Sequence, residues 1–355
     1  MSGYQSDHIK KAISERNNRS LWKKMADWTR DRPEGGIAVM FIVAQVVCVI
    51  AALAMPDQFR YLSQPNIAVF FKAMAPLGIM ALGVGTLMIA GEYDLSVGML
   101  FSFLSIVCAT LTNDWGGDIG AENASAVVPF VALLIVLILG ALIGSAHAFI
   151  TLRFSIPSFI TTLGAMLFWR SATLFYHGAV ALRYKPSEPF FSMFGGVFLD
   201  LFSSSIIWLA IMSVLFYFLL HHHRLGNHFY AVGGNKNAAI AIGIDPARTK
   251  TIAFAIAGTM AAFSGVLAAT RVGSIQPGGG AGMELQAIAA SVIGGAALTG
   301  GRGSILGIVL GTALVFTIQD VLLLIRAPAY YFDGFVGLLI VLAVIMNTAV
   351  RRSKA

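Results

Sequence analysis

The sequence predicts an all-α membrane protein with about ten transmembrane helices and both termini in the cytoplasm. Apolar residues make up 57% of its 355 residues and charged residues only 12%, whereas a typical soluble domain carries about a quarter charged residues. The apolar residues occur in blocks of about 20, the length that a helix needs to cross about 30 Å of hydrocarbon. Because backbone amides inside lipid must be hydrogen-bonded within their own segment, these blocks are expected to be helices.

Ten apolar runs are the candidate spans. The run at 284–299 is short, so it is either a full span or a re-entrant segment, and many runs contain glycines that allow close helix packing. In chain order the runs are 36–55, 66–90, 95–112, 126–150, 158–179, 206–221, 251–270, 284–299, 304–325 and 332–350.

The distribution of Lys and Arg predicts the orientation of these spans. An even number of spans places both termini on one side, and that side carries 17 of the 24 basic residues against 5 on the other. Basic residues concentrate in cytoplasmic loops, so the termini and the long loop 222–250 are expected in the cytoplasm. The chain then divides into a cytoplasmic segment 1–35, a transmembrane domain 36–350 and a cytoplasmic tail 351–355.

A polar stretch, GEYDLSVG at 91–98, interrupts the apolar runs on either side of it. Asp94 precedes the next apolar run, where its carboxylate can cap the free amides of a first helical turn. Polar residues at membrane depth also commonly face a cavity, which would place Asp94 and Ser96 along a translocation path. The sequence leaves both interpretations open.

The loop 222–250 contains a predicted two-turn helix. Asn235 is a suitable N-cap for residues 236–242, Gly243 suits the position after the helix, and Pro246 prevents its continuation. So short a helix needs a partner surface or the membrane face to hold it. We therefore expect this part of the loop to contact another protein or the membrane. The candidate contact residues are Gly233, Gly234, Asn235, Ala238, Ala239 and Gly243.

Three further polar residues fall inside apolar runs. Arg170 lies near the middle of the run 158–179, where an arginine is costly and usually faces protein or water. Gln319 and Asp320 lie toward the outer part of the run 304–325. With Asp94 and Ser96, these residues are the predicted translocation path, although Arg170 could equally serve a structural partner.

No sequence motif indicates an enzyme. The chain has no HExxH metal motif and no GxxxxGK[ST] phosphate loop, so no cofactor or metal is expected in it. If ATP and Mg²⁺ are used, another chain binds them. The net charge of +7 follows the membrane topology and does not indicate nucleic-acid binding.

Four motifs in order resemble one family. They are GEYDLSVG at 91–98, PSFITTLG with the following Arg170 at 157–170, AVGGNKNAAIAIGID at 231–245 and MELQAIAASVIGGAALTGGRGS at 283–304. Together they resemble the membrane permeases of bacterial sugar-uptake ABC transporters, whose members include ribose, xylose, galactose and arabinose permeases. Branched-chain amino acid permeases lack the Asp-Leu-Ser-Val-Gly run, so the resemblance favours a sugar.

The resemblance implies a multi-pass permease subunit of the bacterial inner membrane that forms the path for a monosaccharide or related polyol. Its implied partners are a cytoplasmic ATP-binding subunit with two nucleotide-binding domains, a periplasmic sugar-binding protein and a second permease chain, in a homodimer. The helix near 235–243 would then dock on the ATPase. Two alternatives stay open from the residues alone: a proton-coupled secondary transporter of a small polar solute, using Glu92 or Asp94, and a membrane component that does not transport.

Overall fold

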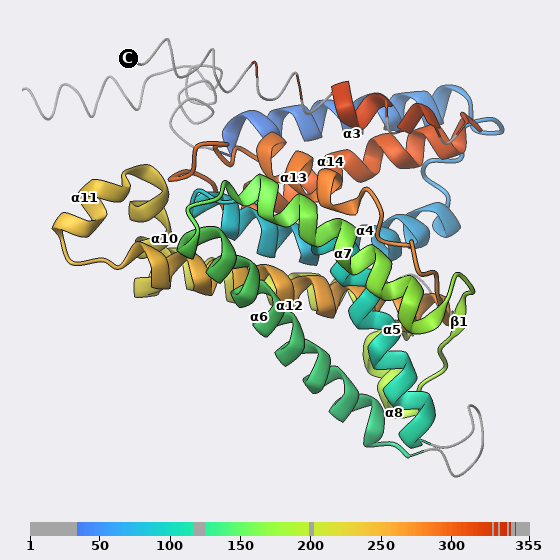
Figure 1. Ribbon diagram of the computed structural model, residues 1–355. Coiled ribbons are helices and arrows are strands. Elements are labelled where there is room, and N and C mark those ends of the chain that lie inside the picture. Colours follow the sequence, from blue (N-terminus) through green and yellow to red (C-terminus); the bar gives the residue numbers. More distant parts are fainter. Residues whose placement is uncertain are drawn as a thin grey trace, which may run out of the picture.

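The computed structural model describes residues 34–116, 125–198 and 202–328, and parts of 330–345. Within these residues the chain is almost entirely helical, and two pairs of two-residue strands are the exception (Figure 1). The helices are α3 Gly35–Ala54, α4 Gln64–Ile89, α5 Val97–Gly116, α6 Val128–Arg153, α7 Ser158–His177, α8 Glu188–Phe194, α9 Ser204–His222, α10 Arg224–Gly234, α11 Lys236–Ala241, α12 Pro246–Val272, α13 Met283–Ile293 and α14 Ile305–Leu324. The strands are β1 Leu182–Arg183, β2 Val197–Phe198, β3 Phe202–Ser203 and β4 Ser274–Ile275, with β1 pairing β4 and β2 pairing β3.

Seven helices in the described residues are long and apolar enough to cross a membrane: α3, α4, α5, α6, α9, α12 and α14. Each coincides with a predicted span, which confirms a multi-pass helical protein. The predicted span 158–179 is the 20-residue helix α7, which has the length of a span but is not among the seven. The predicted span 332–350, the segment 1–35 and the tail lie largely or wholly outside the described residues.

The helix found in the predicted span 284–299 is shorter than a full crossing requires. Helix α13 has 11 residues, about 16 Å at 1.5 Å per residue, which is half of the hydrocarbon thickness. It begins beside the first turns of α5, where the Gly280 amide donates to Ser102 Oγ at 2.9 Å. It ends at Gly294, and a turn carries the chain to α14. This geometry favours the re-entrant alternative.

Helix α12 is the centre of the fold, packed against α4, α5 and α6. Asp245 caps it by accepting from the Ala247 and Arg248 amides, and it ends at Gly273, whose φ of +75° suits glycine. At its contact with α6, a Cβ on Gly258 would lie 2.1 Å from the Gly140 carbonyl oxygen. The two backbones can approach this closely only because both positions are glycine.

The α6–α12 contact makes a matched prediction. Gly258→Ala forces the two helices apart and should lower the stability by about 1–3 kcal/mol, the usual cost of overpacking. Gly164→Ala on α7 is the control, because no atom lies within 4 Å of its added Cβ. Thermal unfolding of the detergent-solubilised protein measures both. Equal melting temperatures for the two variants would contradict this account of the contact.

Candidate functional site

The turn between α4 and α5, residues 90–96, is non-helical and largely buried, and side chains of α7 accept from two of its backbone amides. The Tyr93 amide donates to Ser158 Oγ at 3.2 Å, and the Leu95 amide donates to Thr162 Oγ1 at 3.0 Å. Both acceptors belong to the first turns of α7. The turn therefore fixes the start of α7 as well as the junction of α4 and α5.

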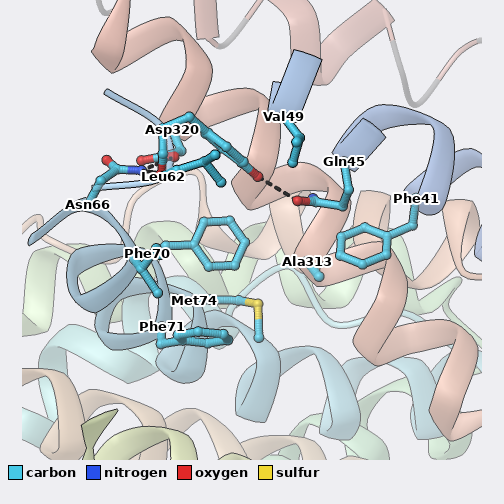
Figure 2. A pocket seen from close by; sticks show the side chains of 12 residues that line it. Phe41, Gln45, Val49, Leu62, Asn66, Phe70, Phe71, Met74, Ala313 and Asp320 are labelled. Atoms are coloured by element: carbon cyan, nitrogen blue, oxygen red, sulfur yellow. Dashed lines mark hydrogen bonds between the residues drawn. The ribbon is translucent and has the colours of Figure 1, made fainter. Parts of the chain in front are cut away.

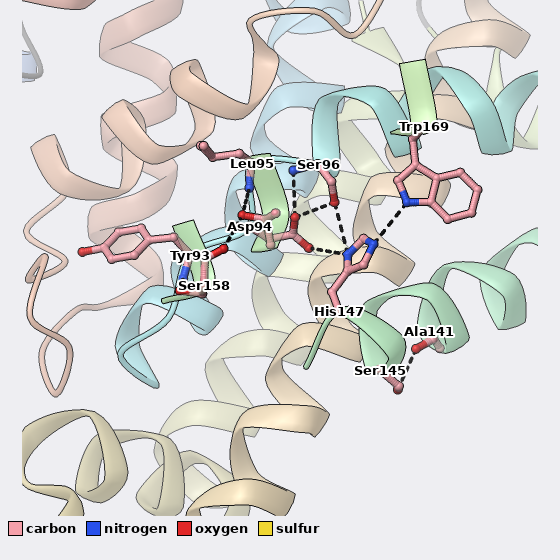
Figure 3. Close-up of polar contacts among 10 residues, drawn as sticks. Tyr93, Asp94, Leu95, Ser96, Ala141, Ser145, His147, Ser158 and Trp169 are labelled. Atoms are coloured by element: carbon pink, nitrogen blue, oxygen red, sulfur yellow. Dashed lines mark hydrogen bonds and ion pairs between the residues drawn. The ribbon is translucent and has the colours of Figure 1, made fainter. Parts of the chain in front are cut away.

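Asp94 has two sets of contacts. Its Oδ1 accepts from the Ser96 amide at 2.8 Å and from Ser96 Oγ at 2.5 Å, which fixes the turn immediately before α5; the predicted cap on amides of the first turn of α5 is not among these bonds. Its Oδ2 lies 3.5 Å from Nδ1 of His147 on α6 (Figure 3). Asp94 and Ser96 are fully buried, so neither faces an open path in this conformation, and a role for them in translocation stays a prediction.

Two further contacts attach the turn to its surroundings. Glu92 forms an ion pair with Lys250 of α12 at 2.5 Å, with both side chains 13% exposed. The Tyr93 hydroxyl donates to the Leu298 carbonyl. Burial, with the charge of Glu92 beside it, raises the pKa of Tyr93 to about 12, so the phenol keeps its proton at physiological pH.

Three glycine-containing segments meet on the α10 side of the turn. A Cβ on Gly233 would lie 1.9 Å from the Ile89 carbonyl oxygen, and one on Gly300 would lie 2.8 Å from Cα of Gly91. The Gly301 amide donates to the Ile89 carbonyl at 2.8 Å. We call the contact of Ile89, Gly91, Gly233, Gly300 and Gly301 the glycine junction. It joins the end of α10 to the end of α4 and to the turn before α14.

The short helix predicted in the loop 222–250 is confirmed as α11. Asn235 Oδ1 accepts from the Ala238 amide at 3.0 Å, and Gly243 has a φ of +83°. The 11-residue helix α10, which the sequence analysis did not predict, precedes it. Its Tyr230 hydroxyl donates to the Gly303 carbonyl at 2.9 Å, and burial, with a smaller contribution from Glu34, raises the pKa of that phenol to about 12.

The tip of this hairpin exposes two large apolar side chains beside the polar Lys236 and Asn237. Helices α10 and α11 project from one end of the bundle (Figure 1), and Ile240 and Ile242 are 52% and 73% exposed there. Ala238, Asn235, Gly234 and Gly243 are also exposed, whereas Ala239 is buried and Gly233 half-buried. The predicted contact residues therefore divide into an outer, exposed set at the tip and an inner set, Gly233 and Ala239.

The remaining predicted path residues lie apart from Asp94 and from one another. Arg170 is exposed on the outer face of α7, and Gln319 is half-buried on α14. Asp320 is buried and accepts from Asn66 Nδ2 at 2.8 Å. The structure thus does not assemble the five predicted residues into one site within a single chain.

Asp320 lies at the edge of a cavity of about 280 Å³ between α3, α4 and α14 (Figure 2). The polar groups at this edge bond to one another: the Tyr61 hydroxyl donates to Gln45 Oε1 at 2.7 Å, and Gln45 Nε2 donates to Thr317 Oγ1 at 2.9 Å. Phe41, Phe70, Phe71 and Met74 line the rest. A sugar would leave most of its hydroxyls unpaired against such a wall, so this cavity does not support the predicted path role of Asp320.

Comparison with known proteins agrees with the four motifs. Residues 66–344 match the model of the family described as branched-chain amino acid transport system / permease component. The chain belongs to this permease family. The xylose/arabinose import permease XylH of Sulfolobus acidocaldarius is 31% identical over 86% of this chain and 84% of its own. The ribose import permease RbsC of Escherichia coli K12 is 33% identical over 76% and 81%. The autoinducer 2 import permease LsrC of Salmonella typhi is 30% identical over 86% and 84%. No solved structure matches.

Family membership makes the chain a transport subunit and not an enzyme. The permease is a multi-pass protein of the inner membrane, and it works with a separate ATPase and a substrate-binding protein. His147, which contacts Asp94, and Trp169, which bonds to His147, were missed by the sequence analysis. They lie 53 and 75 residues further along the chain, so no local spacing connects them to it.

The glycine junction yields a prediction from two adjacent residues. Gly233→Ala should disrupt the junction and cost about 1–3 kcal/mol, because its Cβ overlaps the Ile89 carbonyl. The matched control, Gly234→Ala, adds a Cβ that meets only Cα of Gly301, at 3.8 Å, an ordinary contact. Thermal unfolding and protease resistance of the 222–250 segment should separate the two. A tolerated Gly233→Ala would show that the segments are not in contact in the membrane.

Proposed function

We propose that this permease forms the translocation path of an ATP-driven importer for a monosaccharide or related polyol. The observation that carries the proposal is the α10–α11 hairpin. Its tip exposes two isoleucines and its base packs through glycine backbones against the end of α4 and the 90–96 turn. An apolar tip outside the membrane suits a protein partner. Because the contact at its base is between backbones at glycine positions, a displacement of the hairpin would be transmitted directly to the membrane helices.

The proposed partner at the tip is a cytoplasmic ATP-binding subunit with two nucleotide-binding domains, and it supplies the sites for ATP and Mg²⁺. A periplasmic sugar-binding protein would deliver the substrate on the opposite side. This assignment places loop 222–250 and both termini in the cytoplasm, in agreement with the distribution of Lys and Arg. The chain would have ten membrane segments, of which α13 either crosses the membrane or is re-entrant.

A second copy of the permease would complete the path. Arg170 is the thirteenth residue of the 20-residue helix α7 and is exposed there. An arginine at that depth is costly against lipid, so protein or water is expected to cover this face of α7. A homodimer that places α7 at a water-filled interface would satisfy Arg170.

The substrate class rests on two observations. The relatives are named for xylose, arabinose, ribose and autoinducer 2, and this chain carries the Asp94–Gly98 run that favoured a sugar over an amino acid. The proton-coupled alternative is less well supported, because the Glu92 carboxylate is paired with Lys250.

Co-purification with the candidate ATPase tests the proposal. Ile242→Glu places a charge at the exposed tip and should reduce ATPase recovery at least about tenfold, the loss expected when a charge enters an apolar contact. The control is Lys185→Glu, an exposed change beside β1; β1 pairs with β4 at the far end of α12 from α11. Full ATPase recovery with Ile242→Glu would contradict docking at this tip.

Uptake by proteoliposomes that contain the complete importer tests the substrate class. Labelled ribose, xylose and arabinose are expected to enter with ATP, and leucine is not. Leucine uptake would overturn the sugar assignment. Uptake that follows a proton gradient without ATP would overturn the importer itself.

A further inference from the structure

Three side chains from three elements, those of Trp169, His147 and Asp94, form a relay beside the 90–96 turn (Figure 3). Trp169 of α7 donates its indole Nε1–H to Nε2 of His147 at 3.1 Å. The other ring nitrogen of His147, Nδ1, lies 3.5 Å from Asp94 Oδ2 and 3.3 Å from Ser96 Oγ. His147 is 5% exposed. The relay thus joins α7, α6 and the turn.

The partners determine where the proton of His147 resides. An indole N–H is only a donor, so Nε2 of His147 must be the acceptor and carries no proton. The ring proton is then on Nδ1, which faces the Asp94 carboxylate. A doubly protonated ring would point a second N–H at the N–H of Trp169, so the intact relay requires a neutral His147.

The relay is not a nucleophilic triad. In a Ser-His-Asp triad the serine and the carboxylate contact opposite nitrogens of the histidine. Here Ser96 and Asp94 both approach Nδ1, and Ser96 Oγ donates to Asp94 itself. The arrangement can hold a position but cannot activate the serine.

The relay has a second point of attachment to α7. The first turns of α7 already contact the 90–96 turn through Ser158 and Thr162. Trp169 lies seven residues beyond Thr162, about 10 Å further along the helix. Two attachments at different heights fix both the tilt and the rotation of α7, and therefore the direction in which its exposed Arg170 points.

We infer that His147 and Trp169 are positioning residues of the transport cycle. Through the Nδ1–H tautomer of His147, a displacement of the 90–96 turn also displaces α6 and α7. Through the glycine junction, a displacement of the α10–α11 hairpin displaces that turn. This inference rests on the proposed function for its role in transport, whereas the relay itself can be tested on the isolated permease.

The tautomer is the first test. Permease labelled with ¹⁵N-histidine and placed in nanodiscs gives ring-nitrogen signals by NMR, and His147→Asn identifies those of His147. We expect a protonated Nδ1 and an unprotonated Nε2 at neutral pH. A protonated Nε2 would overturn the inference, because Trp169 could not then donate to it.

A double-mutant cycle tests whether Asp94 and Trp169 are coupled through His147. The melting temperature of Asp94→Asn with Trp169→Phe should fall by less than the sum of the single changes, since either one already breaks the relay. With Asn at position 147 the two changes should become additive. The control pair replaces Trp169→Phe by Trp208→Phe on α9, whose indole donates to the Met193 carbonyl instead. Additive effects in the wild-type background would overturn the inference.

The transport role is tested by the amount of pentose taken up for each ATP hydrolysed. Trp169→Phe should lower this ratio about twofold to thirtyfold, the range expected when a coupling network is altered, while the ATPase still co-purifies. Trp208→Phe should leave it unchanged. An unchanged ratio in Trp169→Phe would overturn the positioning role. Failure of any sugar to enter with the wild type would instead count against the proposed function.

Discussion

The fold depends on how a buried, non-helical turn satisfies its backbone. Between α4 and α5 the chain leaves helical geometry among membrane helices, where an amide without a partner costs several kcal/mol in lipid. Hydroxyls of α7 accept from Tyr93 and Leu95, and the Asp94 carboxylate accepts from Ser96. These bonds fix where α5 begins and where α7 begins, and the contact of Asp94 with His147 attaches α6. The positions of three helices therefore depend in part on this one turn.

The same turn connects the membrane helices to the segment outside them. On one side it contacts α6 and α7 through polar side chains, and on the other it contacts α10 through glycine backbones. Polar side-chain contacts are directional, and each side chain can change its hydrogen-bond partner. Close-packed backbones, by contrast, cannot move relative to one another without losing their contact. A displacement of the hairpin is therefore transmitted rigidly as far as the turn. Beyond the turn, it is distributed by hydrogen bonds whose partners are specific.

Local signals in the sequence predicted local structure well. The Asn235 cap and Gly243 at the end of α11 each depend on a few adjacent residues. The polar residues inside apolar runs were harder to interpret, because polarity does not say which way a side chain points. Arg170 faces outward and Asp320 borders an apolar cavity, so the predicted path was not assembled. His147 gave no signal because its partners come from distant segments, and the short α13 was ambiguous because apolar length alone does not separate a half-span from a span.

The long sequence separation within the glycine junction has a consequence for biosynthesis. Gly91 leaves the ribosome about 140 residues before Gly233 and about 210 before Gly300, and chains elongate at about 5–20 residues per second. The turn after α4 therefore waits about ten seconds or more, in or near the insertion machinery, for the segments that cover it. During that interval the contacts of Gly91 and Ile89 with residues 233, 300 and 301 are missing, and water, lipid headgroups or the translocase take their place. A nascent chain halted before residue 300 should thus be a preferred substrate for membrane quality control, even with most of its helices already inserted.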